Sequence, residues 1–180
     1  MAGSSRSGLF SRAAWLSLVA AGLAIVAATW RILAHDDVRR AGLGVAGAGL
    51  GLLLGVTFAH RSPAQAWLRR WWFADAIMDR LFDGAILGSI AWVSRETQPA
   101  IAAGALVALG TGFLGSYVRA RGASLGYEVE ESVRTRGLRY AVLAIGLLLD
   151  GLAWAVWTVA VLSTIAALVR TSQVAKEERA

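Results

Sequence analysis

Long apolar blocks separated by short charged links constrain this chain more than any other feature of its sequence. Hydrophobic residues make up 57% of its 180 residues, and they gather in blocks close to the length that crosses a bilayer as an α-helix. We therefore expect an all-α integral membrane protein of six transmembrane helices, with a membrane domain at 13–170 and tails at 1–12 and 171–180. The expected spans are about 13–33, 41–58, from the 75–84 stretch to 93, 100–117, 138–149 and 153–169.

Lys and Arg are unevenly divided between the two sides that six spans create. Thirteen of them lie in the N-terminal tail, in the Trp- and Arg-rich 60–73 segment, in the 119–139 loop and from residue 170 to the C-terminus, and four lie on the opposite side. Because cytoplasmic loops are enriched in positive charge, we expect both termini in the cytoplasm and the chain in the cytoplasmic membrane. The 60–73 segment is typical of a helix lying at the membrane interface. Asp36 and Arg95 are expected on the far side.

The composition excludes several classes of function. The chain has no cysteine, so thiol catalysis, disulfides and thiolate metal sites are excluded. Its net charge of +6 rests almost entirely on arginine, and no soluble basic domain is present that would bind nucleic acid. The arginines near the spans instead favour the lipid bilayer and anionic lipids as partners.

Three carboxylates recur every fourth residue beside an apolar span, at Asp75, Asp79 and Asp83. On a helix this spacing places them on one face. One interpretation is a solvated turn in which neighbouring arginines pair with the acids. The other is a metal-binding face in which one carboxylate acts as a general base. A small transporter is disfavoured because the carboxylates lie at the edge of a span.

Two groups of arginines follow. Arg119 and Arg121 end the fourth span, and Arg136 and Arg139 open the fifth. Arginines at these places serve either as positive-inside anchors or as a clamp for phosphate, which guanidinium binds in a bidentate manner.

Taken in order, these segments resemble the CDP-alcohol phosphatidyltransferase family, and within it the phosphatidylinositol-phosphate-synthase-like branch. The family signature is DxxDGxxAR, then eight or nine residues, then GxxxDxxxD, and Asp75-x-x-x-Asp79 resembles its last part. The similarity covers about 71–140. Three further pieces are similar to family motifs, namely 80–85 to the D-R-x-x-D-G-A continuation, 116–121 to S-Y-x-K/R-A-R, and 136–139 to the R-P-E-R run.

The resemblance implies transfer of a phosphatidyl group from CDP-diacylglycerol to an alcohol or alcohol phosphate, with release of CMP. It implies Mg²⁺ or Mn²⁺ as the cofactor if the chain is active, Asp79 as the catalytic base and Asp75 as a metal ligand. Asp83 lies one turn from Asp79 and is the local candidate to replace a missing metal ligand. It also implies that the acceptor phosphate is held by Arg119, Arg121, Arg136 and Arg139.

The chain departs from the family in the first half of the signature. The segment 53–61 contains no Asp or Glu, and Trp71 stands where the family has glycine. Because two hard cations need several oxygen donors, we expect a degenerate member with little or no transferase activity. The alternative is a non-catalytic membrane protein that binds lipid or partners an active paralogue. A homodimer is compatible with the sequence.

Overall fold

The computed structural model describes residues 2–34, 38–61, 65–127 and 133–177. These residues form six α-helices, which confirms the all-α prediction. The helices are α1 (Ala2–Leu33), α2 (Val38–His60), α3 (Gln65–Ser94), α4 (Pro99–Ser124), α5 (Val133–Leu148) and α6 (Leu152–Glu177).

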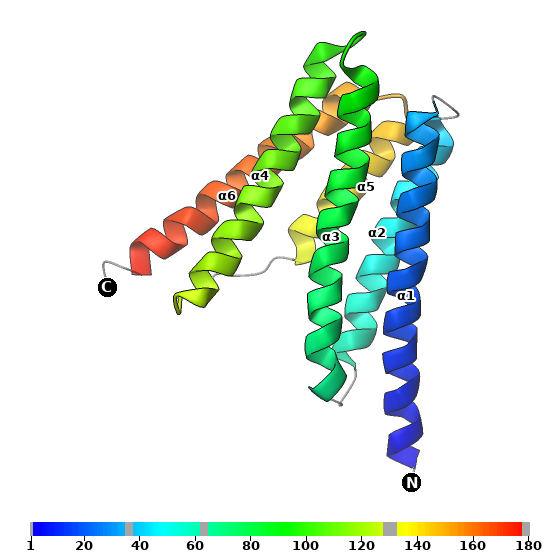
Figure 1. Cartoon of the computed structure of the whole chain (residues 1–180), viewed down its shortest axis with the longest axis vertical. Helices are drawn as coiled ribbons and strands as arrows, with labels where there is room; N and C mark the ends of the chain where they lie inside the picture. Colours follow the sequence, from blue (N-terminus) through cyan, green and yellow to red (C-terminus); the bar gives the residue numbers. More distant parts are fainter. Residues whose placement is uncertain (1, 35–37, 62–64, 128–132, 178–180) are drawn as a thin grey trace.

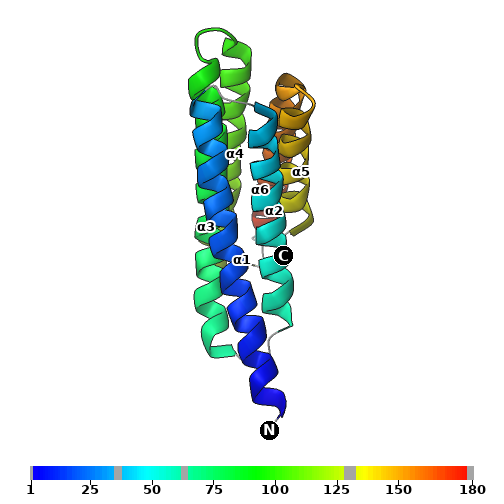
Figure 2. The ribbon, with the colours of Figure 1, turned by 90° about the vertical axis from the view of Figure 1, so that its right-hand side faces the viewer.

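The helices form a closed ring of two layers, α1, α3 and α4 in one and α2, α5 and α6 in the other (Figures 1 and 2). Around the ring the neighbours in contact are α1–α2, α2–α5, α5–α6, α6–α4, α4–α3 and α3–α1, and α2 also touches α3. Within the described residues, the backbones of α3 and α5 face each other across the ring without packing directly. Long side chains must therefore fill the space between these two helices.

Small residues draw α1 and α2 together at the most extensive helix interface. Ala14, Ala21 and Ala28 recur every seventh residue on α1 and are fully buried. A Cβ added at Gly44 would lie 2.9 Å from the Cβ of Ala28, and one at Gly51 would lie 3.1 Å from that of Ala21. Close backbone approach through small residues is the usual basis of helix packing in membranes.

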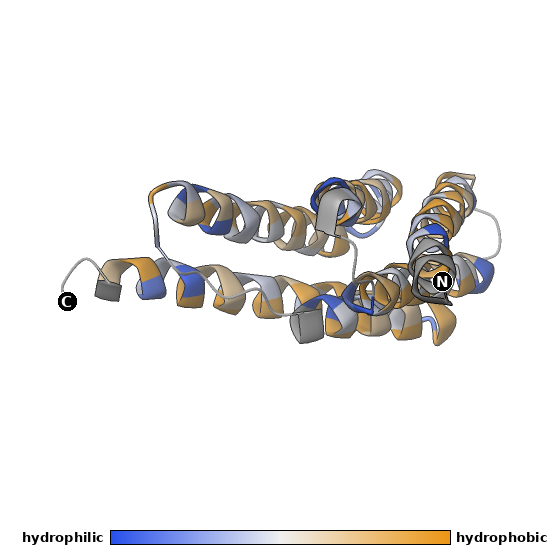
Figure 3. Ribbon diagram, turned by 90° about the horizontal axis from the view of Figure 1, so that it is seen from below, coloured by the Kyte–Doolittle hydropathy of each residue, from blue (hydrophilic) through white to orange (hydrophobic). Residues whose placement is uncertain are grey.

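Four of the helices in the described residues are long and apolar enough to cross a membrane, namely α1, α2, α4 and α6. Hydrophobic residues predominate along the ribbons, and hydrophilic ones occupy few positions (Figure 3). Large apolar side chains such as Leu23 and Trp30 point outward, with 69% and 71% of their surface exposed. The two remaining helices differ because α3 carries the charged residues and α5 has only 16 residues. These features are those of a membrane protein.

Helix boundaries follow local sequence signals in some places and not in others. Pro99 occupies the start of α4, as a proline after a polar turn predicts, and Asp150 adopts a positive φ of 55° in the turn before α6. Residues 65–73 of the segment expected as an interfacial helix instead form the first turns of α3, while His60 ends α2. Nothing between Gln65 and Ser94 breaks a helix, so the two predicted pieces are continuous. Asp36 lies outside the described residues.

Candidate functional site

The three carboxylates of α3 lie inside the ring. Asp75, Asp79 and Asp83 are 1%, 5% and 2% exposed. As their spacing predicts, they form one row along the helix face that looks toward α5. The solvated interpretation of these residues is therefore wrong: the acids are buried and must be stabilised by partners within the protein.

Two arginines of α5 reach across the ring to this row. Arg136 Nη1 lies 2.6 Å from Asp75 Oδ2, and its Nε lies 3.3 Å from Asp79 Oδ1. Arg139 Nη1 lies 2.8 Å from Asp83 Oδ2, and its Nη2 lies 3.5 Å from Asp79 Oδ2. Residues three apart on a helix share a face, so the two guanidinium groups bracket the middle carboxylate.

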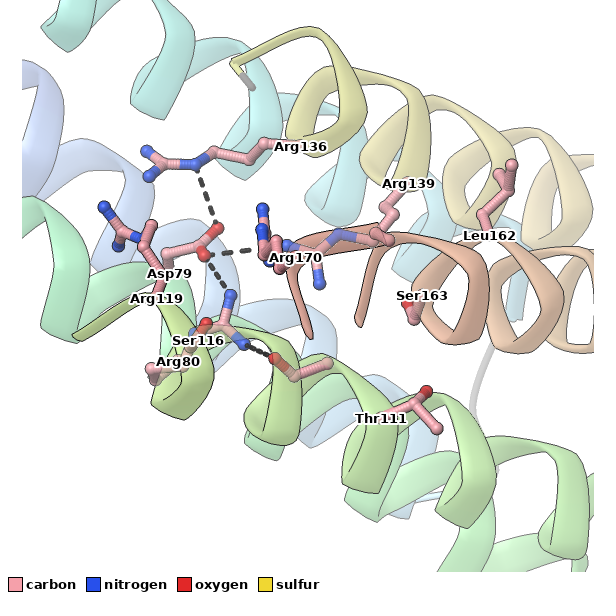
Figure 4. Close-up of a pocket in the computed structure, with 12 residues that line it drawn as sticks. Asp79, Arg80, Thr111, Ser116, Arg119, Arg136, Arg139, Leu162, Ser163 and Arg170 are labelled. Carbon is pink, nitrogen blue, oxygen red and sulfur yellow. Dashed lines mark hydrogen bonds and ion pairs between the residues drawn. The ribbon is translucent and has the colours of Figure 1, made fainter. Parts of the chain in front are cut away.

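Asp79 is the centre of the network. Arg80 pairs with it and also with Asp83, at 3.1 Å, and donates a hydrogen bond of 2.9 Å to the Gly112 carbonyl of α4. The Tyr140 hydroxyl of α5 donates a further hydrogen bond to Asp79. Figure 4 shows the contacts of Arg80, Arg136 and Arg139 converging on Asp79. Asp79 is thus held by three guanidinium groups and one hydroxyl.

The network is balanced in formal charge. Asp75, Asp79 and Asp83 contribute three negative charges, and Arg80, Arg136 and Arg139 contribute three positive ones. Buried charges of one sign are very costly, whereas paired and hydrogen-bonded charges are tolerated. The arginines therefore neutralise the whole carboxylate row without any other cation.

A small pocket of about 50 Å³ opens beside Asp79 (Figure 4). Four helices line it, namely α3, α4, α5 and α6, and α4 and α6 contribute two further arginines. Ser163 Oγ is buried in its wall and has no hydrogen-bond partner among the described residues. The lining residues are Asp79, Arg80, Thr111, Gly112, Ser116, Arg119, Arg136, Arg139, Leu162, Ser163, Ala166 and Arg170.

The structure brings together most of the predicted phosphate-binding residues but not all. Arg119, Arg136 and Arg139 line the pocket, whereas Arg121 lies in a separate groove between the ends of α4 and α6. Two residues along a helix correspond to about 200° of rotation, so Arg119 and Arg121 point to different sides. Tyr140 and Arg170 were not among the sequence predictions. Tyr140 could have been found, since it continues the face of Arg136 and Arg139.

The segment of α2 in which the resemblance places two aspartates carries no acidic side chain, and its buried residues pack against Trp71. Trp71 is fully buried, donates a hydrogen bond of 3.1 Å from Nε1 to the Ala14 carbonyl, and packs against α2. A Cβ added at Gly55 would lie 2.9 Å from Trp71 Cζ2. The indole ring and the small residues of α1 and α2 fill this corner of the ring, together with Val56 and Ala59.

These residues do not fit the two-metal site that the resemblance implies. Within the described part of the chain, no three acidic or histidine side chains are placed to hold a metal ion. The three carboxylates are spread along α3, and each has a guanidinium partner instead. A divalent cation needs several converging oxygen donors, and α2 supplies none from its side chains near Trp71.

Comparison with known proteins identifies the relatives of this chain. No family model matches it. An 81-residue segment is 37% identical to phosphatidylinositol phosphate synthase of Corynebacterium glutamicum, and the match spans 43% of this chain and 37% of that protein.

The fold is shared with the phosphatidylinositol phosphate synthase of Mycobacterium tuberculosis. Its structure with CDP-diacylglycerol bound superimposes with a TM-score of 0.68 at 18% identity, over 94% of this chain and 92% of that one. A second structure of that enzyme, with manganese and citrate, gives a TM-score of 0.62 at 20% identity, over 88% and 81% of the two chains. The matched segment is therefore homologous to part of a phosphatidylinositol phosphate synthase, and the chain as a whole shares the fold of such an enzyme.

Proposed function

We propose that this chain is a degenerate phosphatidyltransferase homologue that binds the phosphate of an anionic phospholipid and transfers nothing. The observation that carries the proposal is the pairing of every carboxylate in the row with arginine. Asp75, Asp79 and Asp83 would have to exchange these partners for metal ions before metal-dependent transfer could begin.

That exchange is energetically unfavourable. Removing one partner from a buried ion pair costs about 3–5 kcal/mol, because the other charge is left without compensation. A cation entering the row would leave the guanidinium groups of Arg136 and Arg139 facing it inside the ring. Asp79, the proposed base, is also held by three guanidinium groups and by Tyr140, so it cannot accept a proton from an alcohol without losing them.

The pocket suits a phosphate group better than a nucleotide. Its volume of about 50 Å³ holds a few water molecules or one small anion, whereas sites for larger ligands usually enclose several hundred Å³. Five arginines and one carboxylate line it. The partnerless Ser163 hydroxyl offers a further donor to an oxyanion. Arginine-rich, hydroxyl-bearing pockets are typical of phosphate binding.

The competing function is the family reaction itself. If the chain is active, it transfers a phosphatidyl group from CDP-diacylglycerol to an alcohol or alcohol phosphate and releases CMP. In that case Asp79 would be the base, Asp75 and Asp83 would hold Mg²⁺ or Mn²⁺, and the four predicted arginines would bind the acceptor. The solved relative with manganese and citrate supports metal use in that enzyme.

Binding of an anionic lipid also depends on the side of the membrane on which the pocket opens. We place both termini on the cytoplasmic side from the excess of Lys and Arg there. A lipid with an anionic headgroup in the inner leaflet would then reach Arg119 and Arg170 from the cytoplasmic side. Whether two copies associate is a separate question for cross-linking.

Two assays test this function. Purified protein with Mn²⁺ and CDP-diacylglycerol should release no CMP above background with glycerol 3-phosphate or inositol phosphate as acceptor. Metal-dependent release that disappears in Asp79→Asn would establish the family reaction instead.

Binding is measured separately, with dioleoyl phosphatidic acid in detergent micelles. Arg119→Gln should weaken it, whereas Arg121→Gln, two residues away but outside the pocket, should not. Equal effects of the two variants would contradict binding at this pocket.

A further inference from the structure

A second, larger cavity lies on the outer side of α3 and α4. Its volume is about 490 Å³, and Arg80 is the one charged residue that lines it among the described residues. Phe73, Ile77 and Leu81 of α3 and Phe113 of α4 are the large apolar side chains that line it, and all four are exposed on the molecule. The cavity therefore faces the region that lipid tails occupy.

The helical phase of α3 explains why this cavity is apolar. Phe73, Ile77 and Leu81 each precede a carboxylate of the buried row by two residues, which is about 200° of rotation. The same helix thus presents acids to the interior and large apolar side chains to the outside. Between these large side chains the surface is hollowed at Gly84, where an added Cβ would meet nothing within 4 Å.

Arg80 is shared by the cavity and the phosphate pocket. Its guanidinium pairs with Asp83 at 3.1 Å and donates to the Gly112 carbonyl on the inner side. On the outer side its Cζ lies 5.6 Å from the centre of the Phe113 ring, within the range of a cation–π contact. One side chain therefore separates an arginine-lined pocket from a membrane-facing apolar cavity.

We propose that the cavity holds one acyl chain of the lipid whose phosphate occupies the arginine pocket. The inference rests on the proposed function and adds the place of the tail. A phospholipid carries its anionic phosphate and its apolar chains side by side, which is the arrangement that the two adjoining spaces offer. An apolar cavity stays dry, so hydrocarbon is the occupant that matches its chemistry.

Because the cavity faces the bilayer, most of the affinity for the lipid is expected to come from its phosphate group. Hydrocarbon gains little by moving from the bilayer to another apolar environment, so packing inside the cavity contributes modestly. The phosphate contacts contribute the larger part, and the cavity selects lipids whose chain can lie beside Arg80. Filling the cavity should therefore weaken binding of a long-chain lipid and spare a ligand that has only the headgroup.

Gly84→Leu fills the cavity without a backbone clash, because the space around its Cβ is open. Gly88→Leu is the matched control: it makes the same change one turn further along α3, also into open space, and Gly88 does not line the cavity. Both variants are tested in the full-length protein in detergent against dioleoyl phosphatidic acid and against glycerol 3-phosphate, which has no acyl chain.

Gly84→Leu should bind dioleoyl phosphatidic acid about tenfold more weakly than the unmodified protein, a change of about 1.4 kcal/mol, with unchanged binding of glycerol 3-phosphate. Gly88→Leu should leave both affinities unchanged. If Gly84→Leu binds dioleoyl phosphatidic acid as tightly as the unmodified protein, the proposal is overturned. The same holds if the only effect of Gly84→Leu is on cross-linking between two copies of the chain. If Arg119→Gln changes the binding of neither ligand, the proposal that the arginine pocket binds phosphate is refuted instead. The two experiments therefore distinguish failure of the acyl-chain site from failure of the phosphate site.

Discussion

Removing Arg139 tests whether arginines neutralise the carboxylate row. Arg139 Nη1 lies 2.8 Å from Asp83 Oδ2, and the two side chains are 11% and 3% exposed. Breaking a buried ion pair costs about 3–5 kcal/mol. Because Asp83 retains Arg80 at 3.1 Å, we expect the lower end of that range, about 3 kcal/mol, for Arg139→Met. In a chain of this size such a loss lowers the unfolding midpoint by about 6–12 °C.

The assay is thermal unfolding of the purified protein in mild detergent, followed by circular dichroism. The double variant Arg139→Met/Asp83→Leu removes both charges and should recover most of the lost stability, since a buried pair replaced by apolar groups is often neutral. Arg39→Met breaks the exposed pair with Asp150 and serves as the control, with an expected cost below about 1 kcal/mol. The reasoning would be refuted if Arg139→Met had the same unfolding midpoint as Arg39→Met. It would also be refuted if the loss of stability in the double variant equalled the sum of the losses caused by Arg139→Met and Asp83→Leu alone.

Three further predictions concern the metal, Trp71 and the topology. Mn²⁺ or a chelator should leave the unfolding midpoint of the unmodified protein unchanged, since the carboxylates are already paired; a clear rise with Mn²⁺ would show a metal site after all. Trp71→Ala should destabilise the protein by about 3–5 kcal/mol in the same assay, because it empties a fully buried site. Trp71→Phe keeps a ring in that site and should cost about 1 kcal/mol, because it removes the hydrogen bond to the Ala14 carbonyl. Equal losses of stability in the two variants would contradict the role of that hydrogen bond. A cysteine at Glu96 should react with an impermeant reagent from outside the cell and one at Ala175 should not, in a chain that has no other cysteine; the reverse pattern would invert the orientation.

The helices and the carboxylate face could be predicted because both depend on local periodicity. Apolar blocks indicate helices in a membrane, and a spacing of four residues places Asp75, Asp79 and Asp83 on one face whatever surrounds them. The continuity of α3 was missed because the Trp- and Arg-rich beginning of the helix resembles an interfacial segment. The structure has one continuous helix over Gln65–Ser94, and Trp71 near its start packs against α1 and α2.

The partners of the carboxylates could not be predicted, because they depend on how far apart the layers lie. Arginines on α5 were read as phosphate ligands from the resemblance, and the structure places Arg136 and Arg139 both in the pocket and on the acids. Helical phase alone could have separated Arg119 from Arg121, since their side chains cannot share one site two residues apart. Arg170 carried no signal beyond its place near the end of an apolar span.

The placement of α5 opposite α3 also bears on how the protein is made. Synthesis proceeds from the N-terminus, so α3 and its three acids leave the ribosome well before Arg136 and Arg139 exist. During that interval Arg80, on the same helix, is the partner already present for the row. Burial of α3 inside the ring must therefore wait for α5, which makes the nascent chain dependent on a water-accessible or chaperoned environment until about residue 140 has been added.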